Sequence, residues 1–320
     1  AEATPAEAAP AEATPAEAPK VEAAAAQAAV PMVEEAPKVE EAPKAETTNL
    51  AQQGAASEGL VGFVTGSVSL SAGGSTIVNS TVANTLMFVT PPTHNHDTPV
   101  VSRVGKVEQG FQVGLEQVPC FKKYQGNAHS GNEEMSYMIV SSGTIDLGEG
   151  KTLVAWSEEG ISYTTKKVFR SVSFPKGVTF SSEPICVAQV QTNNNPGFIK
   201  TRMNVLKDKI EVRLDAAETG QYDSSSMKEP EKPETVGFLC VSDSGSILGH
   251  PIEAKKIKTD KNDETVQCGF DRALASIGTR NGMNSAQLRK NADGKFKLEE
   301  DKCQDNEEKH RDEMIHCIGF

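Results

Sequence analysis

The feature that most constrains the fold of this chain is a repeated pair of strand-like runs separated by serine and glycine. VSSGTIDLG at residues 140–148 reappears about 100 residues later as VSDSGSILG at 241–249, and a shorter form, VTGSVSL, occupies 64–70. A recurrence at this interval indicates one structural unit used several times. Each copy is interpreted as a strand, a Ser/Gly break and a strand, and the copies at 140–148 and 241–249 are interpreted as seams at which one folding unit ends and the next begins.

Other segments recur in the same order between these seams. A strand-like run precedes a short polar insert three times, in TLMFVTPP, PICVAQVQ and RALASIG. The inserts themselves are THNHD (93–97), TNNNPG (192–197) and TRNGMN (279–284). Each unit then closes with acidic residues that lead into an apolar run, as in EEMSYMIV, PETVGFLCV and RDEMIHCIGF.

A hairpin signal lies between each insert and the closing run. SRVGKVEQGFQVGLE, TRMNVLKDKIEVRLD and LRKNADGKFKLEED each indicate a strand, a tight turn and an alternating strand. The first two copies align with Arg103 and Arg202 in register, and the third aligns with Leu288. Gly110 and Gly294 suit the positive φ that a hairpin turn requires.

These repeats predict an all-β fold of three tandem six-stranded antiparallel β-sandwich units. About six strands in roughly 80–100 residues, with turn signals at regular spacing, are typical of such a sandwich. The predicted units span residues 59–140, 141–241 and 242–320. No Pro- or Gly-rich linker separates them, so we expect one compact body rather than independent domains.

Residues 1–58 differ in composition and are predicted to form a disordered Ala/Pro/Glu tether. The first 57 contain 21 Ala, 7 Pro and no aromatic residue, too little apolar surface to offset chain entropy. Their 10 Glu against 3 Lys leave −7 of the chain's net charge of −12. The remainder has no basic stripe and no apolar run near ~20 residues, so we expect no nucleic-acid partner and no membrane span.

The six cysteines are too few for a disulfide-dense scaffold. Cys186 and Cys240 lie in apolar strand-like runs and are interpreted as buried small hydrophobic residues. Cys303 and Cys317 can pair with each other or with Cys268, and the sequence leaves the pairing open. No CxxC motif is present, so we expect no structural zinc site.

The repeated unit resembles the H-type lectin domain of snail agglutinins. The shared features are an opening strand in SSGTIDLG, a strand beginning Pro-x-x-Val in PICVAQV, a turn ending in Gly-Phe in VEQGF at 107–111, and an apolar closing strand. The resemblance covers residues from about 60 to 320. It implies sandwiches that assemble as trimers and bind galactose-type sugars between neighbouring subunits. Three units in one chain are therefore expected to pack as a pseudo-trimer.

The resemblance also implies where a sugar would bind. The family places a sugar-contacting Arg in the loop that corresponds to the three inserts, and Arg280 is the residue that matches. The family's Trp-His pair beyond the Gly-Phe turn has no counterpart in this chain. The single Trp, Trp156, lies in what the alignment makes a long connection of the second unit.

We predict that any ligand contacts come from the inserts, where amide side chains can read hydroxyl groups. The candidate residues are His94, Asn95, His96, Asp97, Asn193, Asn194, Asn195, Arg280 and Asn281. An H-x-H motif on a strand can ligate a metal, but this one lies in a loop with no third His nearby in sequence. We therefore predict no metal site and no cofactor. The alternative is that the inserts are ordinary turns.

Asn79-Ser80-Thr81 is an N-glycosylation sequon, which is informative if the protein is secreted. We expect a secreted or cell-surface location. The alternative is an organelle lumen reached after removal of a targeting peptide, which would explain a sequence that starts at Ala1 without Met.

No local signature of a catalytic triad, a Cys/His pair, paired carboxylates or a phosphate-binding glycine loop is present, so we predict no catalytic residues and no enzyme. The leading hypothesis is a non-enzymatic carbohydrate-binding or adhesion protein with glycans or glycoproteins as partners. The alternative is a structural subunit that binds protein partners in a larger assembly through its sandwich surfaces. The missing Trp-His pair favours this alternative.

Overall fold

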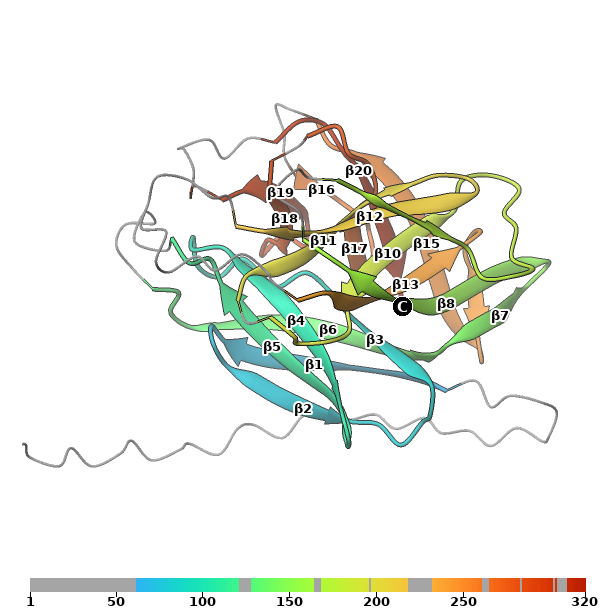
Figure 1. The fold of residues 1–320 in the computed structure, drawn as a ribbon, viewed down its shortest axis with the longest axis horizontal. Helices are drawn as coiled ribbons and strands as arrows, with labels where there is room; N and C mark the ends of the chain where they lie inside the picture. The colour runs from blue at the N-terminus through green and yellow to red at the C-terminus, as the bar shows by residue number, and fades with distance from the viewer. Residues whose placement is uncertain are drawn as a thin grey trace, which may run out of the picture. The chain divides into compact units, whose positions relative to one another are not determined.

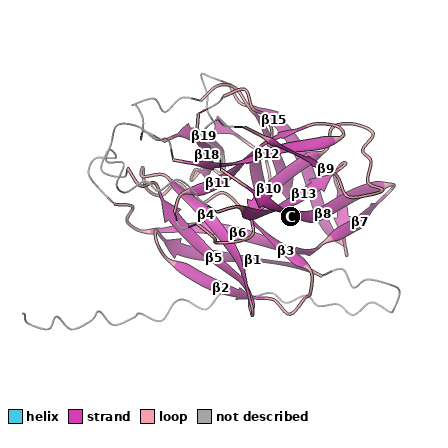
Figure 2. Cartoon of the chain, viewed as in Figure 1, coloured by secondary structure: helices cyan, strands magenta, loops and turns pink. Residues whose placement is uncertain are grey.

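The computed structural model describes residues 62–120, 128–163, 168–195, 197–217, 232–260, 265–282, 284–301, 303 and 310–320. Every helix or strand assigned within these ranges is a β-strand, which confirms the predicted all-β class (Figure 2). The strands belong to one compact unit (Figure 1). The predicted tether at residues 1–58 lies outside the described residues.

The first predicted range contributes two antiparallel sheets of three strands, with the orders β1-β6-β3 and β2-β5-β4. The strands are β1 (Phe63–Ser71), β2 (Ser75–Asn79), β3 (Thr85–Val89), β4 (Val100–Val107), β5 (Gly110–Gln117) and β6 (Asn132–Ser141). Gly110 has a φ of 142°, as expected for the hairpin turn between β4 and β5.

The second range also forms two antiparallel sheets, with the orders β10-β13-β8-β7 and β11-β12-β9. The strands are β7 (Gly143–Gly148), β8 (Lys151–Ile161), β9 (Arg170–Ser173), β10 (Ile185–Val190), β11 (Ile199–Val205), β12 (Lys209–Ala216) and β13 (Glu234–Val241).

The third range repeats this plan with the orders β14-β15-β20-β17 and β16-β19-β18. The strands are β14 (Gly245–Ile247), β15 (His250–Lys258), β16 (Thr265–Val266), β17 (Ala273–Ile277), β18 (Ala286–Lys290), β19 (Phe296–Glu300) and β20 (Met314–Gly319). To within one residue, each of the six sheets takes all its strands from one predicted range. The three-unit organisation itself stays a prediction.

Each range has a hydrophobic core between its two sheets. In the first range, Tyr137 and Ile139 of β6 pack in one cluster with Phe111 and Val113 of β5. Comparable clusters lie between the two sheets of the second and third ranges. Face-to-face packing of two sheets around such a core is the arrangement of a β-sandwich.

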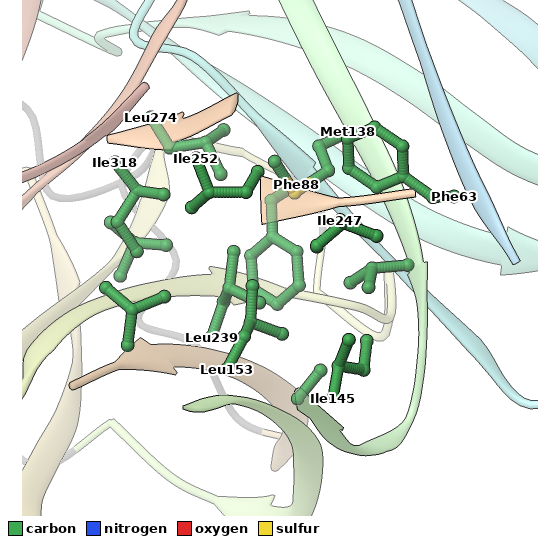
Figure 3. Close-up of a cluster of buried hydrophobic side chains, with 14 of the residues drawn as sticks. Phe63, Phe88, Met138, Ile145, Leu153, Leu239, Ile247, Ile252, Leu274 and Ile318 are labelled. Atoms are coloured by element: carbon green, nitrogen blue, oxygen red, sulfur yellow. The ribbon is translucent and has the colours of Figure 1, made fainter. Parts of the chain in front are cut away.

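A further hydrophobic cluster joins all three ranges, and Figure 3 shows its side chains converging. Phe88, Val187 and Leu274 occupy equivalent places in β3, β10 and β17, each five positions before an insert threonine. The matching residues of the closing strands are Met138, Leu239 and Ile318. We call this cluster the shared core.

The shared core explains why the closing strands are apolar without interruption. Met138 and Val140 of β6 face the shared core, whereas Tyr137 and Ile139 face the core of their own range. Successive residues of a strand point to opposite faces, so both faces of β6 are buried. The same alternation holds for β13 and β20.

The seams at 140–148 and 241–249 connect strands of different sheets. β6 and β7 belong to different sheets, and so do β13 and β14. The comparison with VTGSVSL was wrong, because residues 64–70 lie in the unbroken strand β1. In the first range, β1 pairs with the closing strand β6. In the second range, the strand that pairs with the closing strand β13 in the same way is β8, and not β7.

Among the described residues, the second and third ranges have seven strands each, and the first has the predicted six. The segments interpreted as long connections contain two strands each, β8 and β9 in the second range and β15 and β16 in the third. Trp156 lies in β8. These segments mix polar and apolar residues, which hid their strand character.

The cysteines at positions 186 and 240 form a disulfide, so the interpretation as simple buried hydrophobic residues was wrong. Cys186 and Cys240 lie directly opposite each other on neighbouring strands β10 and β13. Adjacency on neighbouring strands could not be deduced from the sequence alone.

The remaining four cysteines form two further disulfides. Cys268 bonds Cys317, which is one of the pairings left open by the sequence. Cys303 bonds neither of these residues but Cys120, across 183 positions of sequence. This bond ties the segment after β5 in the first range to the segment after β19 in the third, which are not consecutive in the chain.

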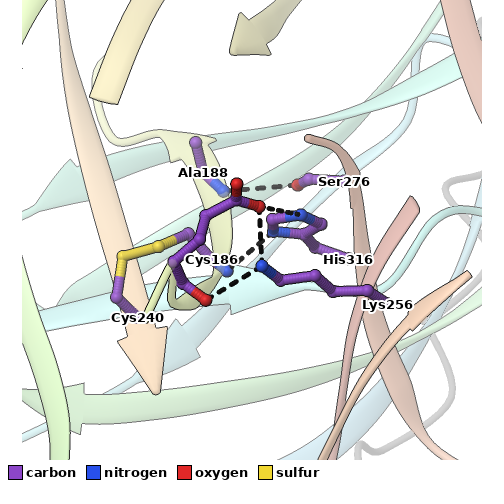
Figure 4. Close-up of a disulfide and its surroundings, with 7 residues drawn as sticks. Cys186, Ala188, Cys240, Lys256, Ser276 and His316 are labelled. Carbon is purple, nitrogen blue, oxygen red and sulfur yellow. Dashed lines mark hydrogen bonds and ion pairs between the residues drawn. A yellow bond between two sulfur atoms is a disulfide. The ribbon is translucent and has the colours of Figure 1, made fainter. Parts of the chain in front are cut away.

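The second and third ranges also meet at His316, beside the Cys186–Cys240 disulfide (Figure 4). The N–H of Cys186 donates to Nδ1 of His316 at 3.0 Å, so this imidazole is held with Nδ1 as an acceptor. Burial, together with the nearby ammonium of Lys256, lowers the pKa of His316 to about 3. The carboxylate of Glu183 lies 4.0 Å from Nε2.

Loss of the Cys120–Cys303 bond should destabilise the fold. A cross-link over a long loop mainly restricts the unfolded chain, and its removal typically costs about 2–5 kcal/mol. We expect the double variant Cys120→Ser/Cys303→Ser to unfold at lower temperature and lower urea concentration, measured by circular dichroism. An unchanged midpoint in both experiments would contradict this role.

Stability should fall as the pH drops below about 6.5. His316 has a lower pKa in the folded than in the unfolded protein, so its contribution is complete above its unfolded pKa and is lost toward pH 3, at about 1.4 kcal/mol per pH unit. His316→Gln keeps an acceptor but does not titrate. Urea unfolding between pH 6.5 and 5 should show a shallower pH slope for this variant, and equal slopes would contradict the assignment.

Candidate functional site

Each polar insert is folded onto a buried glutamate at the start of a closing strand. The side chains of Glu133, Glu234 and Glu313 are fully buried, with 0% exposure. We call each of these glutamates, together with the insert that it holds, a glutamate anchor. Burial of an ionised carboxylate is costly unless hydrogen bonds and an opposite charge compensate for it, so the surroundings of these groups decide whether the loops hold their shape.

The same hydrogen bonds build all three anchors. The insert threonine donates its hydroxyl to the glutamate and accepts from the N–H of the residue after that glutamate. The backbone N–H two residues after the threonine donates to the carboxylate at 3.1 Å in every anchor. The threonines are Thr93, Thr192 and Thr279.

The asparagine at that second position is also tied down in each anchor. The side-chain amides of Asn95, Asn194 and Asn281 donate to the carbonyl oxygen that precedes the glutamate, at 2.7–2.8 Å. In the second anchor Asn195 additionally donates to Glu234 from its backbone and its side chain, at 3.0 and 2.9 Å. These amide donors therefore serve to hold the loops.

An arginine from a different predicted range enters two of the anchors directly. Arg103 of β4 pairs with Glu234 at 3.3 Å and donates to three carbonyl oxygens of the insert at 192–197. Arg202 of β11 pairs with Glu313 at 2.5 Å and donates to two carbonyl oxygens of the insert at 279–284. Both arginines are almost fully buried.

A third arginine, Arg289 of β18, contacts the insert of the first anchor. It donates to the carbonyl oxygens of His96, Asp97 and Thr98 at 2.5, 3.1 and 3.2 Å, while its charge is balanced by Glu299 at 2.5 Å. The first range thus holds the insert of the second, the second holds that of the third, and the third holds that of the first.

Backbone hydrogen bonds run in the same direction around this cycle. Each joins an N–H on or beside β4, β11 or β18 to the carbonyl oxygen just before the next insert, at 2.8–3.0 Å. The pairs are Lys106 to Gln191, Val205 to Gly278 and Lys290 to Pro92.

A histidine completes the first anchor. His129 contacts Glu133 at 2.7 Å with its side chain fully buried. Burial opposes ionisation of Glu133, but hydrogen bonds from His129, Thr93 and Asn95 outweigh it and hold the pKa of this carboxyl below its usual value.

A second histidine lies in the third anchor, between Glu300 and Glu313. Burial favours its neutral form, but hydrogen bonds to the two carboxylates prevail and raise the pKa of His310. Burial likewise opposes the charge on Glu313, yet His310, Arg202 and Thr279 lower the pKa of Glu313 to about 2.

In the insert at 93–97, the two histidines contact other residues of the protein. Nδ1 of His94 lies 3.1 Å from the amide oxygen of Asn291, and Nδ1 of His96 accepts from the N–H of Thr98 at 3.1 Å. The ring of His96 packs 5.0 Å from that of His129. The side chain of Asp97 is exposed.

Arg280 is the arginine among the predicted site residues, and its side chain is half exposed. It pairs with Glu211 of β12 at 3.1 Å and lies 5.5 Å above the ring of Phe169. Asn193 is also exposed, and its amide oxygen accepts from Arg103 at 3.2 Å. The insert at 279–284 is therefore the one in which an exposed cation and an aromatic ring lie together among the described residues.

Two other groups are unsuited to ligand binding. Trp156 packs into a hydrophobic core, stacked on Phe238 at 5.0 Å, and offers no open platform. Cys120, Asp301 and Cys303 lie close enough to share a metal ion, but both cysteines are in the disulfide and have no thiolate to offer.

A small cleft lies where the three ranges meet. Val89, Ala188 and Ala275 occupy equivalent positions in its lining, together with residues of β4, β11 and β18. Its volume is about 90 Å³. Sites for small-molecule ligands usually measure roughly 300–1,000 Å³, so this cleft is too small to hold a sugar.

Sequence reasoning missed the glutamates and arginines of the anchors. The closing acidic residues were noticed, but only as a lead into an apolar strand. The third hairpin was aligned on Leu288, one residue away from Arg289. A signal was present, because Arg103, Arg202 and Arg289 each follow an insert threonine by ten positions.

Comparisons of the chain with protein-family models, curated proteins and solved structures find no match. Within the described ranges, no helix has the length and hydropathy needed to cross a membrane. The geometry of the described residues is therefore the basis for any assignment of function.

Replacement of Glu313 by Gln should destabilise the fold in a pH-dependent way. Removing one partner of a buried ion pair typically costs about 3–5 kcal/mol, so Glu313→Gln should unfold more readily at pH 7. Because the pKa of Glu313 is about 2, its stabilising effect is complete above about pH 4.5 and is lost toward pH 2.

The difference between wild type and Glu313→Gln in urea unfolding should therefore shrink as the pH falls through this window. Glu253→Gln, which alters an exposed carboxylate, is the matched control and should change little at any pH. A pH-independent difference for Glu313→Gln would contradict the assignment.

Proposed function

We propose that the chain is a non-catalytic carbohydrate-binding or adhesion protein built from three lectin-like sandwich units packed as a pseudo-trimer. The observation that carries this proposal is the cyclic order of the glutamate anchors, in which each arginine reaches the next predicted unit and the third reaches the first. A trimer of separate subunits has the same head-to-tail order of contacts around a closed ring.

The insert at 279–284 is the proposed ligand site. Arg280 offers exposed N–H donors, and Glu211 offers acceptor oxygens. The partly exposed ring of Phe169, over which Arg213 also lies, provides apolar surface beside them. A sugar needs this combination of directional polar groups and an apolar face. The anchor beneath holds the loop in one shape, which limits the entropy lost on binding.

A secreted or cell-surface location is part of the proposal, with an organelle lumen as the alternative. Three disulfides support it, because such bonds persist in oxidising compartments and are rare in the cytosol. Glycans and glycoproteins are the partners that such a location makes accessible.

The second candidate is a structural subunit that binds protein partners in a larger assembly. It is favoured by a specific observation: the amide donors of Asn95, Asn194 and Asn281 are already engaged in the anchors and are not directed at a ligand. In this case the sandwich surfaces, rather than the inserts, would contact the partner.

A glycan array probed with the oxidised, full-length chain separates the two candidates. Binding to a defined class of glycans, lowered at least tenfold in Arg280→Ala, is the result expected for the lectin-like function. Arg272→Ala removes another exposed arginine, outside the inserts, and should bind as wild type does. Absence of binding to any glycan, together with recovery in a stoichiometric protein complex, would support the structural candidate instead.

A further inference from the structure

We propose that Asn79 carries an N-linked glycan that shields the open edge of strand β2. The inference concerns a modification of this chain rather than the ligand that it binds. It rests on the proposed passage through a secretory compartment, but not on the glycan-binding site.

β2 is an exposed edge strand without the usual protection. Within the described residues it pairs only with β5, so its other edge is open. Its sequence, STIVN, has no charge and no proline, and Ile77 is 52% exposed. Uncharged, β-branched edges of this kind can pair with another chain and promote aggregation.

Among the described strands, β2 is the one that exposes a large hydrophobic side chain, Ile77. The edge strand β1 is likewise uncharged, but its exposed residues are the serines Ser67, Ser69 and Ser71. Further exposed edge strands carry a charge or are very short. β7 contains Asp146 and β9 contains Arg170, whereas β14 and β16 have only three and two residues. β2 is therefore the edge at which some other form of protection is expected.

Asn79 is placed where a glycan would cover this edge. It is the last residue of β2 and is exposed. Residues two apart along a strand point to the same face, about 7 Å from each other, so Asn79 and Ile77 are neighbours on the outer face of β2. A glycan on Asn79 would extend over the exposed isoleucine and the open backbone groups beside it.

The position opposite Asn79 leaves room for the attached sugar. Asn79 pairs with Gly110, which has no side chain that could crowd the acceptor. A surface groove of about 700 Å³ begins at Asn79 and runs between residues 79–85 and 106–111. The first sugars therefore have open space next to the acceptor.

The sequon supplies the chemistry. A hydroxyl residue two positions after the asparagine, here Thr81, defines the acceptor for oligosaccharide transfer. The Asn79 amide nitrogen forms a bond to the anomeric carbon of a lipid-pyrophosphate-linked oligosaccharide. The bond from that carbon to the pyrophosphate breaks, the lipid pyrophosphate leaves, and the nitrogen loses one proton.

The first test is the mass of the full 320-residue chain produced through a eukaryotic secretory pathway. We expect a mass above that of the bare polypeptide, removed by a glycoamidase that leaves aspartate at position 79. Asn79→Gln and Thr81→Ala should abolish the added mass, while the matched variant Thr81→Ser should retain it. A secreted wild-type chain with unmodified Asn79 would overturn the proposal.

The second test asks whether the glycan shields β2. Enzymatically deglycosylated protein and Asn79→Gln should self-associate in light scattering, whereas the double variant Asn79→Gln/Ile77→Lys should stay monomeric. Equal monodispersity of the glycosylated protein and Asn79→Gln would overturn the shielding role. Glycan-array binding should be unchanged in Asn79→Gln, so failure of this inference is distinguishable from failure of the proposed function.

Discussion

The rest of the structure depends on the burial of three carboxylates, two of which are paired with an arginine from another predicted unit, while the third, Glu133, is paired with His129 of its own unit. Glu234 and Glu313 lie at full burial next to arginines supplied by another range of the chain, and Arg289 holds the insert of the first anchor through its carbonyl oxygens. A buried charge without its partner is strongly destabilising, so the second and third ranges each depend on the range that supplies their arginine. The polar inserts resemble variable surface loops in the sequence, but in the structure they are the places where one range contacts the next.

The hydrophobic cores also connect the three ranges to one another. Each closing strand contributes alternate side chains to the core of its own range and to the shared core, so its burial is complete only when all three ranges are present. The Cys120–Cys303 disulfide then ties the first range to the third, the pair that the chain does not join directly. Directional ion pairs fix the order of the three ranges, and non-directional apolar packing supplies most of the favourable free energy.

Much of the fold could be predicted from the sequence, because its strands and turns depend on residues that are close together in the chain. Alternating strands, the glycine at Gly110 and the apolar closing runs gave the hairpins and central strands correctly, and the seams do separate sheets. The strands β8 and β15 were missed, because their polar residues obscure the period of two. The disulfides and anchors could not be read in the same way, since Cys120–Cys303 and Arg103–Glu234 join residues far apart in sequence. Their detection needs a comparison of spacings across all three repeats at once.

The central claim is that buried arginine–glutamate pairs couple one predicted unit to the next. A double-mutant cycle on Arg103 and Glu234, with Arg103→Met, Glu234→Gln and the double variant, measures this coupling most directly through the free energy of unfolding in urea. Residues within one ion-pair network typically show interaction energies of about 0.5–3 kcal/mol, and we expect a value in the upper part of that range. Additive effects of the two substitutions would contradict the account.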